Sequence, residues 1–340
     1  DTRVQTVANQ ALAGRAGAVV AMDPRSGAIL AMASGPTFNL NDVATNFAGI
    51  RNRSGAPLLS RPTQSRQPPG STFKVVTATS ALESGRYTAT TPFVDTGRFL
   101  LNGQAITNFG GAKYGAHTFE VALTKSINTT FARIGQDLGP QTLGATMSAF
   151  GFGDNDPALL DLPASMLVSS GRFADGKLLP NDEQGTDTPR IAIGQEKVAA
   201  TPLQMAMVAS ALANGGVLRR PFLVRQVRDR GGDVVREGRP ETLKTVTRPD
   251  VASALSAMMQ SVVREGTGTS AALTGLEVAG KTGTAESGVP GRNQAWFIGF
   301  APAANPVVAV AVLIEDTSGT GGVTAAPVAG QVMRAAVQVS

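Results

Sequence analysis

Five short apolar segments, two near the start of the chain and three near its end, constrain the fold more than any other feature of the 340 residues. The first two lie within residues 17–33 and flank the turn sequence Asp-Pro-Arg-Ser-Gly, which is typical of a β-hairpin. The other three lie at 278–284, 295–301 and 307–315, separated by short turns, as in an antiparallel meander. We therefore expect one antiparallel sheet of about five strands, assembled from both ends of the chain.

Near-continuous hydrophobicity in the first two segments predicts strands that are covered on both faces. Helical patterns fill the middle of the chain and its end, so the fold class is expected to be α/β of the α+β kind, with helices flanking the sheet. Gly and Pro punctuation and an N-cap Thr before Pro at 201–202 place these helices. They are expected at about 71–83, 119–138, 201–213, 249–264 and 327–337.

The chain has no cysteine and a single histidine, His117. This excludes disulfides, thiolate nucleophiles, and metal sites built from Cys or from several His. His117 lies in Gly-Ala-His-Thr, which predicts an exposed turn rather than a site. No cofactor or metal is expected, and the general base is expected not to be an imidazole.

Charge and hydropathy restrict the partners. Thirty Lys and Arg against 25 Asp and Glu give a net charge of +5 without a basic run, and there are one Trp and two Tyr. An aromatic and basic platform for nucleic acid is therefore not expected. The longest apolar stretch, 307–314, is far below the ~18 residues that cross a bilayer, so any membrane anchor is expected upstream of Asp1.

The first motif with chemical meaning is Ser71-Thr72-Phe73-Lys74, which follows Gln-Pro-Pro-Gly and opens an expected helix. Positions three apart share a helix face, so the Ser71 hydroxyl and the Lys74 amine can meet. A helix N-terminus favours a developing negative charge, and a lysine with a lowered pKa can take a proton from serine. Average residue usage gives about one Ser-x-x-Lys in a chain this long, so an ordinary amphipathic helix start explains this motif equally well.

The second motif is Ser126-Ile127-Asn128. Residues two apart do not face the same way on a straight helix, so both polar side chains can enter one cleft only if the helix breaks here. The weak helix formers Thr129 and Thr130 favour a break. A polar patch on a continuous helix is the alternative that this motif alone leaves open.

The third motif is Lys281-Thr282-Gly283-Thr284 in an expected strand. Alternate strand residues share a face, so Lys281 and Gly283 are expected on one side and the two threonines on the other. Gly283 removes a side chain and allows close approach to the backbone. A cation and hydroxyl donors together suit a carboxylate. Even Lys-Thr-Gly should occur by chance in fewer than about one chain of this length in ten.

Together, in this order, the three motifs resemble the signature set of class A β-lactamases and penicillin-binding proteins. The chain resembles the class B penicillin-binding transpeptidases, and among them the actinobacterial penicillin-binding protein A type. The resemblance covers roughly residues 15–340. Its further segments are the hairpin at 17–33, the nucleophile turn at 67–74, Gly-Gln-Glu-Lys at 194–197 with Thr-Pro-Leu-Gln at 201–204, and Ala-Trp-Phe-Ile-Gly-Phe-Ala-Pro at 295–302.

The resemblance implies a penicillin-binding transpeptidase or serine β-lactamase-like fold, with an all-helical subdomain beside the sheet. It implies Ser71 as the acylated nucleophile and Lys74 as its proton acceptor. Ser126 would pass the proton to the departing amine, and Asn128 would bind the substrate amide and help to hold Lys74. Lys281 would add positive charge.

The same resemblance places the substrate carboxylate on the third motif. Thr282 and Thr284 would hold the terminal carboxylate, with Gly283 between them in the substrate-binding strand. The backbone amides of Ser71 and Thr284 would form the oxyanion hole.

The implied function is D,D-transpeptidation, in which a serine acyl-enzyme cross-links peptidoglycan stem peptides and is trapped by β-lactams. A D,D-carboxypeptidase remains open. A β-lactamase is disfavoured because the Glu-x-x-Leu-Asn segment of class A is absent, and because class D enzymes carry valine where this chain has Asn128. A β-lactam sensor domain, which resembles class D, is disfavoured for the same reason.

The resemblance also predicts how the domain is mounted. Residues 1–14 would join the catalytic domain, 15–340, to a pedestal and membrane anchor upstream. The domain would then lie on the outer face of the bacterial cell membrane. There it would meet D-Ala-D-Ala donor and diamino-acid acceptor stem peptides, and glycosyltransferase partners of the cell-division or elongation machinery.

Overall fold

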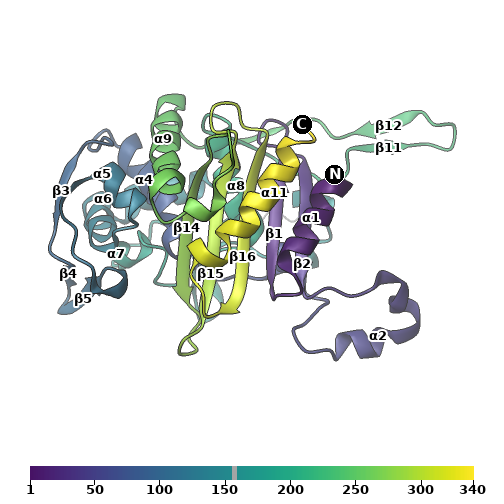
Figure 1. Cartoon of the computed structure of the whole chain (residues 1–340), viewed down its shortest axis with the longest axis horizontal. Helices are drawn as coiled ribbons and strands as arrows, with labels where there is room; N and C mark the ends of the chain where they lie inside the picture. Colours follow the sequence, from purple (N-terminus) through teal and green to yellow (C-terminus); the bar gives the residue numbers. More distant parts are fainter. Residues whose placement is uncertain (155–158) are drawn as a thin grey trace.

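The structure is a computed structural model that describes residues 1–154 and 159–340. Its centre is a five-stranded antiparallel sheet in the order β14-β15-β16-β1-β2 (Figure 1). The strands are β14 (Ala279–Glu286), β15 (Asn293–Ala301), β16 (Val308–Thr317), β1 (Gly17–Met22) and β2 (Ile29–Gly35). The sheet predicted from both ends of the chain is confirmed, and β1 from the start pairs directly with β16 from the end.

Both faces of the sheet are buried, which explains the continuous apolar runs. In β1 every residue is buried, with Val20 in one hydrophobic core and Val19 in the other. In β15, Trp296 likewise packs into the first core and Phe297 into the second. Full burial of such side chains contributes about 1.5–3 kcal/mol each. The second predicted strand differs, because β2 lies at the sheet edge and alternates between buried and half-buried positions.

Helices from both ends of the chain cover one face. There α1 (Thr2–Leu12) and α11 (Ala326–Val337) lie side by side (Figure 1). On the other face α8 packs on β16 and α9 on β14, and a helical half lies beyond them. The helices on this side are α4 (Lys74–Glu83), α5 (Phe119–Thr124), α6 (Asn128–Ala149), α7 (Thr188–Ile191), α8 (Pro202–Ala213) and α9 (Pro249–Glu265). None of the helices in 1–154 and 159–340 is long and apolar enough to cross a membrane.

The start of α8 is as predicted, but the expected end of a helix at Leu138 is wrong, because α6 runs to Ala149. The Thr201 hydroxyl oxygen accepts from the Gln204 amide at 3.1 Å and caps α8, with Pro202 in the first turn. Helix α6 is interrupted at Gly139, whose φ of 71° is left-handed, and continues after Pro140.

The helical half also contains strands, so the expectation of an all-helical subdomain is wrong. The strands outside the main sheet are β3 (Pro92–Asp95), β4 (Arg98–Leu101), β5 (Gln104–Thr107), β6 (Gly115–Thr118), β7 (Gly171–Ala174), β8 (Lys177–Leu179), β9 (Val198–Ala199), β10 (Val217–Arg219), β11 (Gln226–Arg228), β12 (Val234–Glu237) and β13 (Thr242–Thr245). They form small sheets of two or three strands, too short for an alternating pattern to be visible in the sequence. The remaining short helices are α2 (Val43–Arg51), α3 (Arg61–Gln64) and α10 (Gly321–Thr324).

The single histidine lies in a strand and not in an exposed turn. His117 belongs to β6 and is half-buried, with its ring 6.1 Å from that of Phe93. Its Nε2 is hydrogen-bonded to the Thr130 hydroxyl at 2.9 Å and its Nδ1 to the Gly115 carbonyl at 2.8 Å. The prediction was wrong because β6 pairs with β3, a contact that the local sequence does not reveal.

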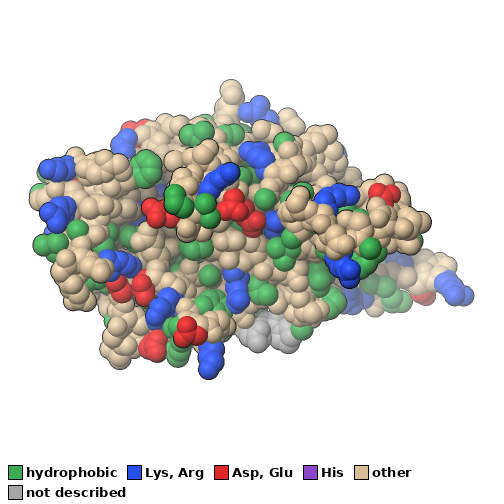
Figure 2. All heavy atoms as spheres, turned by 90° about the horizontal axis from the view of Figure 1, so that it is seen from below, with side chains coloured by type: hydrophobic (Ala, Val, Ile, Leu, Met, Phe, Trp, Pro, Cys, Tyr) green, Lys and Arg blue, Asp and Glu red, His purple; other side chains and the backbone are tan. Residues whose placement is uncertain are grey.

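Charged side chains are interspersed on the surface. The face drawn in Figure 2 carries Lys and Arg beside Asp and Glu, without a large patch of one sign. The mixed charges on this face agree with the absence of a basic run in the sequence, and they form no extended surface of a single charge there.

Candidate active site

Ser71 lies in a tight turn that is held between strand β15 of the sheet and the segment at Gly194. The turn, a 3₁₀ segment at Gly70–Phe73, leads directly into α4. The indole nitrogen of Trp296 donates to the Pro68 carbonyl at 2.9 Å, and the Gly70 amide donates to the Gly194 carbonyl at 3.1 Å. A side chain at Gly194 would approach the Gly70 carbonyl oxygen within 2.0 Å. Strand β15 and residue 194 thus fix the position of the serine.

Lys74, the first residue of α4, is completely buried and points to the second motif. Its Nζ donates to the Asn128 Oδ1 at 2.6 Å, to the Ser126 carbonyl at 2.8 Å and to the Ser126 Oγ at 3.2 Å. Burial, and next the nearby charge of Lys281, hold the pKa of Lys74 well below its usual value. An amine in this state can accept a proton near neutral pH.

Ser126 occupies a break between two helices. Helix α5 ends before it and α6 begins at Asn128, so of the two alternatives that the motif left open the structure has the helix break, and the single helix expected over 119–138 is two helices. The backbone of Ser126 has a φ of 60°, in the left-handed region. Such a conformation costs a non-glycine residue about 1–3 kcal/mol and persists when surrounding contacts impose it.

Lys281 lies on the middle of β14 and is also completely buried. Its Nζ donates to the Ser126 Oγ at 2.9 Å and to the Thr282 carbonyl at 2.9 Å. Burial lowers the pKa of Lys281 to about 7. The Ser126 hydroxyl is therefore contacted by two buried amines, that of Lys74 and that of Lys281.

Strand β14 presents its two faces as the alternation predicts. Lys281 and Gly283 face Ser126 and the nucleophile turn, while the Thr282 hydroxyl pairs with that of Thr267. A Cβ on Gly283 would lie 2.7 Å from the Pro69 carbonyl oxygen. The glycine therefore allows the strand to pack against the nucleophile turn, a reason different from the ligand approach that the sequence suggested.

A groove of about 240 Å³ opens above these groups. Its lining includes Ser71, Ser126, Asn128 and the strand residues 282–284. No sequence motif points to the other lining residues, which are Phe109, Tyr114, Lys125, Ile193, Thr267, Thr320 and Gly322, and Gln195 belongs only to a segment of the family resemblance. None of the described residues of this lining is acidic, so the groove favours an anionic ligand group.

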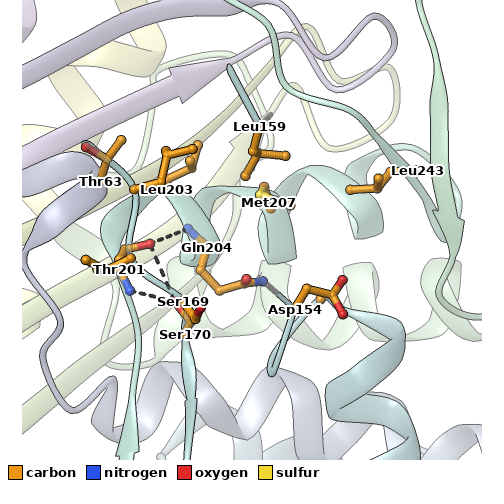
Figure 3. A pocket seen from close by; sticks show the side chains of 13 residues that line it. Thr63, Asp154, Leu159, Ser169, Ser170, Thr201, Leu203, Gln204, Met207 and Leu243 are labelled. Atoms are coloured by element: carbon orange, nitrogen blue, oxygen red, sulfur yellow. Dashed lines mark hydrogen bonds between the residues drawn. The ribbon is translucent and has the colours of Figure 1, made fainter. Parts of the chain in front are cut away.

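A second cavity, which we call the α8 cavity, has a similar size but a different lining. Its volume is about 290 Å³, and Leu159, Leu203, Met207 and Leu243 project into it (Figure 3). The Gln204 side-chain amide there donates to the Phe150 carbonyl at 2.7 Å. The described lining of the α8 cavity contains no lysine that could take a proton from a hydroxyl. The groove lined by Ser71 is therefore the candidate site for acyl transfer.

In the groove, the arrangement can move a proton without a histidine. A neutral Lys74 can take a proton from a hydroxyl. The Ser126 hydroxyl can then pass a proton on from Lys74, because it already contacts the amines of Lys74 and Lys281. Among the described residues, no group of three or more His, Cys, Asp or Glu side chains could hold a metal ion.

Known proteins match this chain along almost its whole length. The family profile described as the penicillin binding protein transpeptidase domain matches residues 17–334. The peptidoglycan D,D-transpeptidase PbpA of Mycolicibacterium smegmatis is 36% identical over 348 residues, which cover 95% of this chain and 67% of that protein.

Solved structures agree. The D,D-transpeptidase domain of an Eggerthella lenta peptidoglycan glycosyltransferase superposes with a TM-score of 0.89 at 36% identity, covering 100% of this chain and 82% of the other. A ceftriaxone acyl-enzyme complex of penicillin-binding protein A from Mycobacterium tuberculosis gives 0.89 at 32% identity, covering 99% and 79%. The predicted fold and resemblance are confirmed, and the chain belongs to the penicillin-binding protein transpeptidase domain family.

Proposed function

We propose that this chain is a peptidoglycan D,D-transpeptidase that works through an acyl-enzyme on Ser71. The observation that carries the proposal is the meeting of three distant chain segments at one hydroxyl. Amines from α4 and β14 both bind the Ser126 Oγ, in the groove that Ser71 lines. Two buried lysines with lowered pKa values beside a serine are suited to acyl transfer without imidazole.

In the first step Ser71 attacks the carbonyl carbon between the two D-alanines of a donor stem peptide. Its proton goes to the neutral amine of Lys74. The proton then passes through Ser126 to the nitrogen of the terminal D-alanine, which leaves as the amide bond breaks. An ester between Ser71 and the shortened donor remains. Asn128 supports this step, because its Oδ1 accepts from Lys74 and fixes the direction of that amine.

Strand β14 would bind both negatively charged groups of the reaction, which are the terminal carboxylate of the donor and the oxyanion that forms when Ser71 attacks. Thr282 and Thr284 would hold the terminal carboxylate, with the charge of Lys281 below them and Gly283 closing the strand onto the nucleophile turn. The Thr284 carbonyl lies next to Gly70, where an added Cβ would approach it within 2.9 Å, so the Ser71 and Thr284 amides lie in adjacent segments. Such an oxyanion hole typically contributes about 3–4 kcal/mol per donor.

In the second step the amine of a neighbouring stem peptide attacks the ester carbonyl. A new amide forms, the ester bond breaks, and Ser71 recovers its proton. A β-lactam would enter the first step, but its amine remains tethered, so the ester persists. Acyl-enzyme complexes of the Mycobacterium tuberculosis relative with ceftriaxone, imipenem and penicillin G support this outcome.

The setting of the domain follows from the same proposal. Peptidoglycan stem peptides are the donor and acceptor, and the outer face of the cell membrane is where they meet the enzyme. Residues 1–14, most of which form α1, would connect the catalytic domain to a pedestal and anchor. Membrane glycosyltransferases of the division or elongation machinery would be its partners, because cross-linking requires newly made glycan strands.

Acceptor-dependent turnover tests this proposal. The chain would be incubated with a D-Ala-D-Ala stem peptide, with and without a second stem peptide that carries a free diamino-acid amine. Mass spectrometry would follow D-alanine and the cross-linked product. We expect the product to appear together with released D-alanine and to require the acceptor. Equal D-alanine release without the acceptor would identify a D,D-carboxypeptidase instead, and rapid turnover of a chromogenic cephalosporin would identify a β-lactamase.

A further inference from the structure

A buried carboxylate outside the three motifs lies behind the Ser126–Asn128 turn. Asp95, the last residue of β3, is 5% exposed. Its Oδ1 accepts from the Thr129 hydroxyl at 2.6 Å and the Gly97 amide at 2.8 Å, and its Oδ2 from Asn108 Nδ2 at 2.8 Å and the Tyr114 amide at 2.9 Å. Burial raises the pKa of this carboxyl, but the four hydrogen bonds outweigh burial and leave the pKa below its usual value.

Two of these donors lead directly to α6. Thr129 is its second residue, and its backbone amide donates to the Asn108 Oδ1 at 3.2 Å. Helix α6 needs such a partner, because the residue at its N-cap, Ile127, has no side chain that can accept a hydrogen bond. Asn108, held by Asp95, therefore caps α6 from another segment.

The same loop also holds the side chain of Asn128. The Asn128 Nδ2 donates to the Thr107 carbonyl at 2.9 Å, which leaves its Oδ1 directed at Lys74 Nζ. Thr107 is adjacent to Asn108, so a carboxylate that holds Asn108 also places the carbonyl that orients the Asn128 amide.

We infer that Asp95 and Thr129 are positioning residues for acylation, which hold the Ser126–Asn128 turn in its reactive geometry. The inference rests on the proposed function of that turn. Neither residue touches the groove; they act through Asn108 and Asn128. The left-handed backbone of Ser126 makes such support necessary, because a strained turn relaxes once the contacts around it are lost.

Thr129→Val tests the link with little change in volume, and Thr129→Ser restores the hydroxyl. Stopped-flow acylation by a fluorescent penicillin would separate the first-order acylation constant from the dissociation constant of the non-covalent complex. We expect Thr129→Val to lower the acylation constant about tenfold, with the dissociation constant within about threefold of wild type. Thr129→Ser should recover the acylation constant to within about twofold. All proteins would be compared well below their melting temperatures.

Asp95→Asn is the stronger variant, because its new NH₂ would face the donors of Asn108 and Tyr114. It should lower the acylation constant more than Thr129→Val. The matched control is Asp23→Asn, which removes a carboxylate that also accepts from a turn, at the Arg25 amide and the Ser26 hydroxyl, in the β1–β2 hairpin. The control should acylate like wild type.

An acylation constant unchanged in Thr129→Val would overturn the inference, as would an equal loss in Thr129→Ser. If wild type itself were not acylated at Ser71, as judged by peptide mass mapping, the proposed function would fail first. These two failures are therefore distinguishable.

Discussion

The catalytic groove and the α8 cavity are two hollows of nearly equal volume, about 240 and 290 Å³, with opposite chemistry. In the α8 cavity, polar groups such as the Gln204 amide and the Thr201 hydroxyl are engaged with neighbouring backbone atoms. In the groove, two completely buried amines lie against one serine hydroxyl, and that serine has a strained backbone.

The difference shows that volume alone does not identify a reactive site. Burying an amine without a carboxylate partner is unfavourable, and among the residues that the structure describes neither Lys74 nor Lys281 forms an ion pair. Groups held in an unfavourable state by the surrounding fold mark the place where chemistry is carried out. Five substitutions test this contrast.

The largest effect is expected for Ser71→Ala. Without the hydroxyl no ester can form, so covalent labelling by a fluorescent penicillin should be abolished. The melting temperature should change little, because the Ser71 hydroxyl makes no hydrogen bond to another described residue that would be lost. Labelling at the wild-type rate would show that another residue is the nucleophile.

Lys74→Met should come next. It removes the proton acceptor but preserves much of the side-chain volume, so the acylation rate constant should fall about 10²–10⁴-fold. The stability to denaturant should rise or stay the same, because a buried amine is replaced by an apolar chain. Loss of stability without loss of acylation would contradict the assigned role.

Lys281→Met should shift the pH dependence of acylation. The charge of Lys281 lowers the pKa of Lys74, so its removal should raise that pKa. Acylation requires neutral Lys74, and its acidic limb should therefore move to higher pH. The rate constant at neutral pH should fall about tenfold, since the Ser126 hydroxyl loses one donor. An acidic limb moved to lower pH would refute the coupling between the two lysines.

Thr282→Val should have an effect of similar size to Lys281→Met, but on binding of the substrate carboxylate instead of on proton transfer. Loss of one hydroxyl donor to a charged group should reduce the second-order acylation constant about tenfold, mostly through weaker non-covalent binding. The acylation kinetics of Thr282→Val can be compared with those of Thr267→Val, which removes the hydroxyl paired with Thr282. Unchanged kinetics in Thr282→Val would remove it from the carboxylate site.

Leu203→Ala in the α8 cavity should have the smallest effect on catalysis. Leu203 is 3% exposed, so its truncation should lower the free energy of unfolding by about 2–5 kcal/mol. The acylation constant should remain within about twofold of wild type. A large kinetic effect would mean that the two cavities are coupled, and the contrast between them would have to be abandoned.

The sequence was sufficient for those features that have a local pattern. Continuous apolar runs predicted the sheet, and the sequence correctly placed Ser71 and Lys74 at the start of a helix. The expected meeting of their side chains stays a prediction, because the hydrogen bonds of the Lys74 amine go to Ser126 and Asn128. Two polar residues two positions apart, followed by threonines, favoured a break at Ser126 but left a continuous helix open. The motifs then identified the family and its reaction, which the relatives confirm.

The parts that could not be predicted depend on contacts between segments far apart in the chain. Asp95 and Thr129 are 34 positions apart, and each alone resembles an ordinary surface residue. Thr267 joins the groove only because the end of α9 reaches β14. The strands β3 to β6 are four residues long, too short to show a period.

The left-handed φ of 60° at Ser126 also limits which amino acids evolution can use there. Threonine carries the same hydroxyl, but its branched Cβ makes this conformation far less accessible. Glycine and asparagine adopt it easily but bring no hydroxyl. The chemistry requires a hydroxyl and the backbone disfavours the branched threonine, so only the two requirements together select serine at this position.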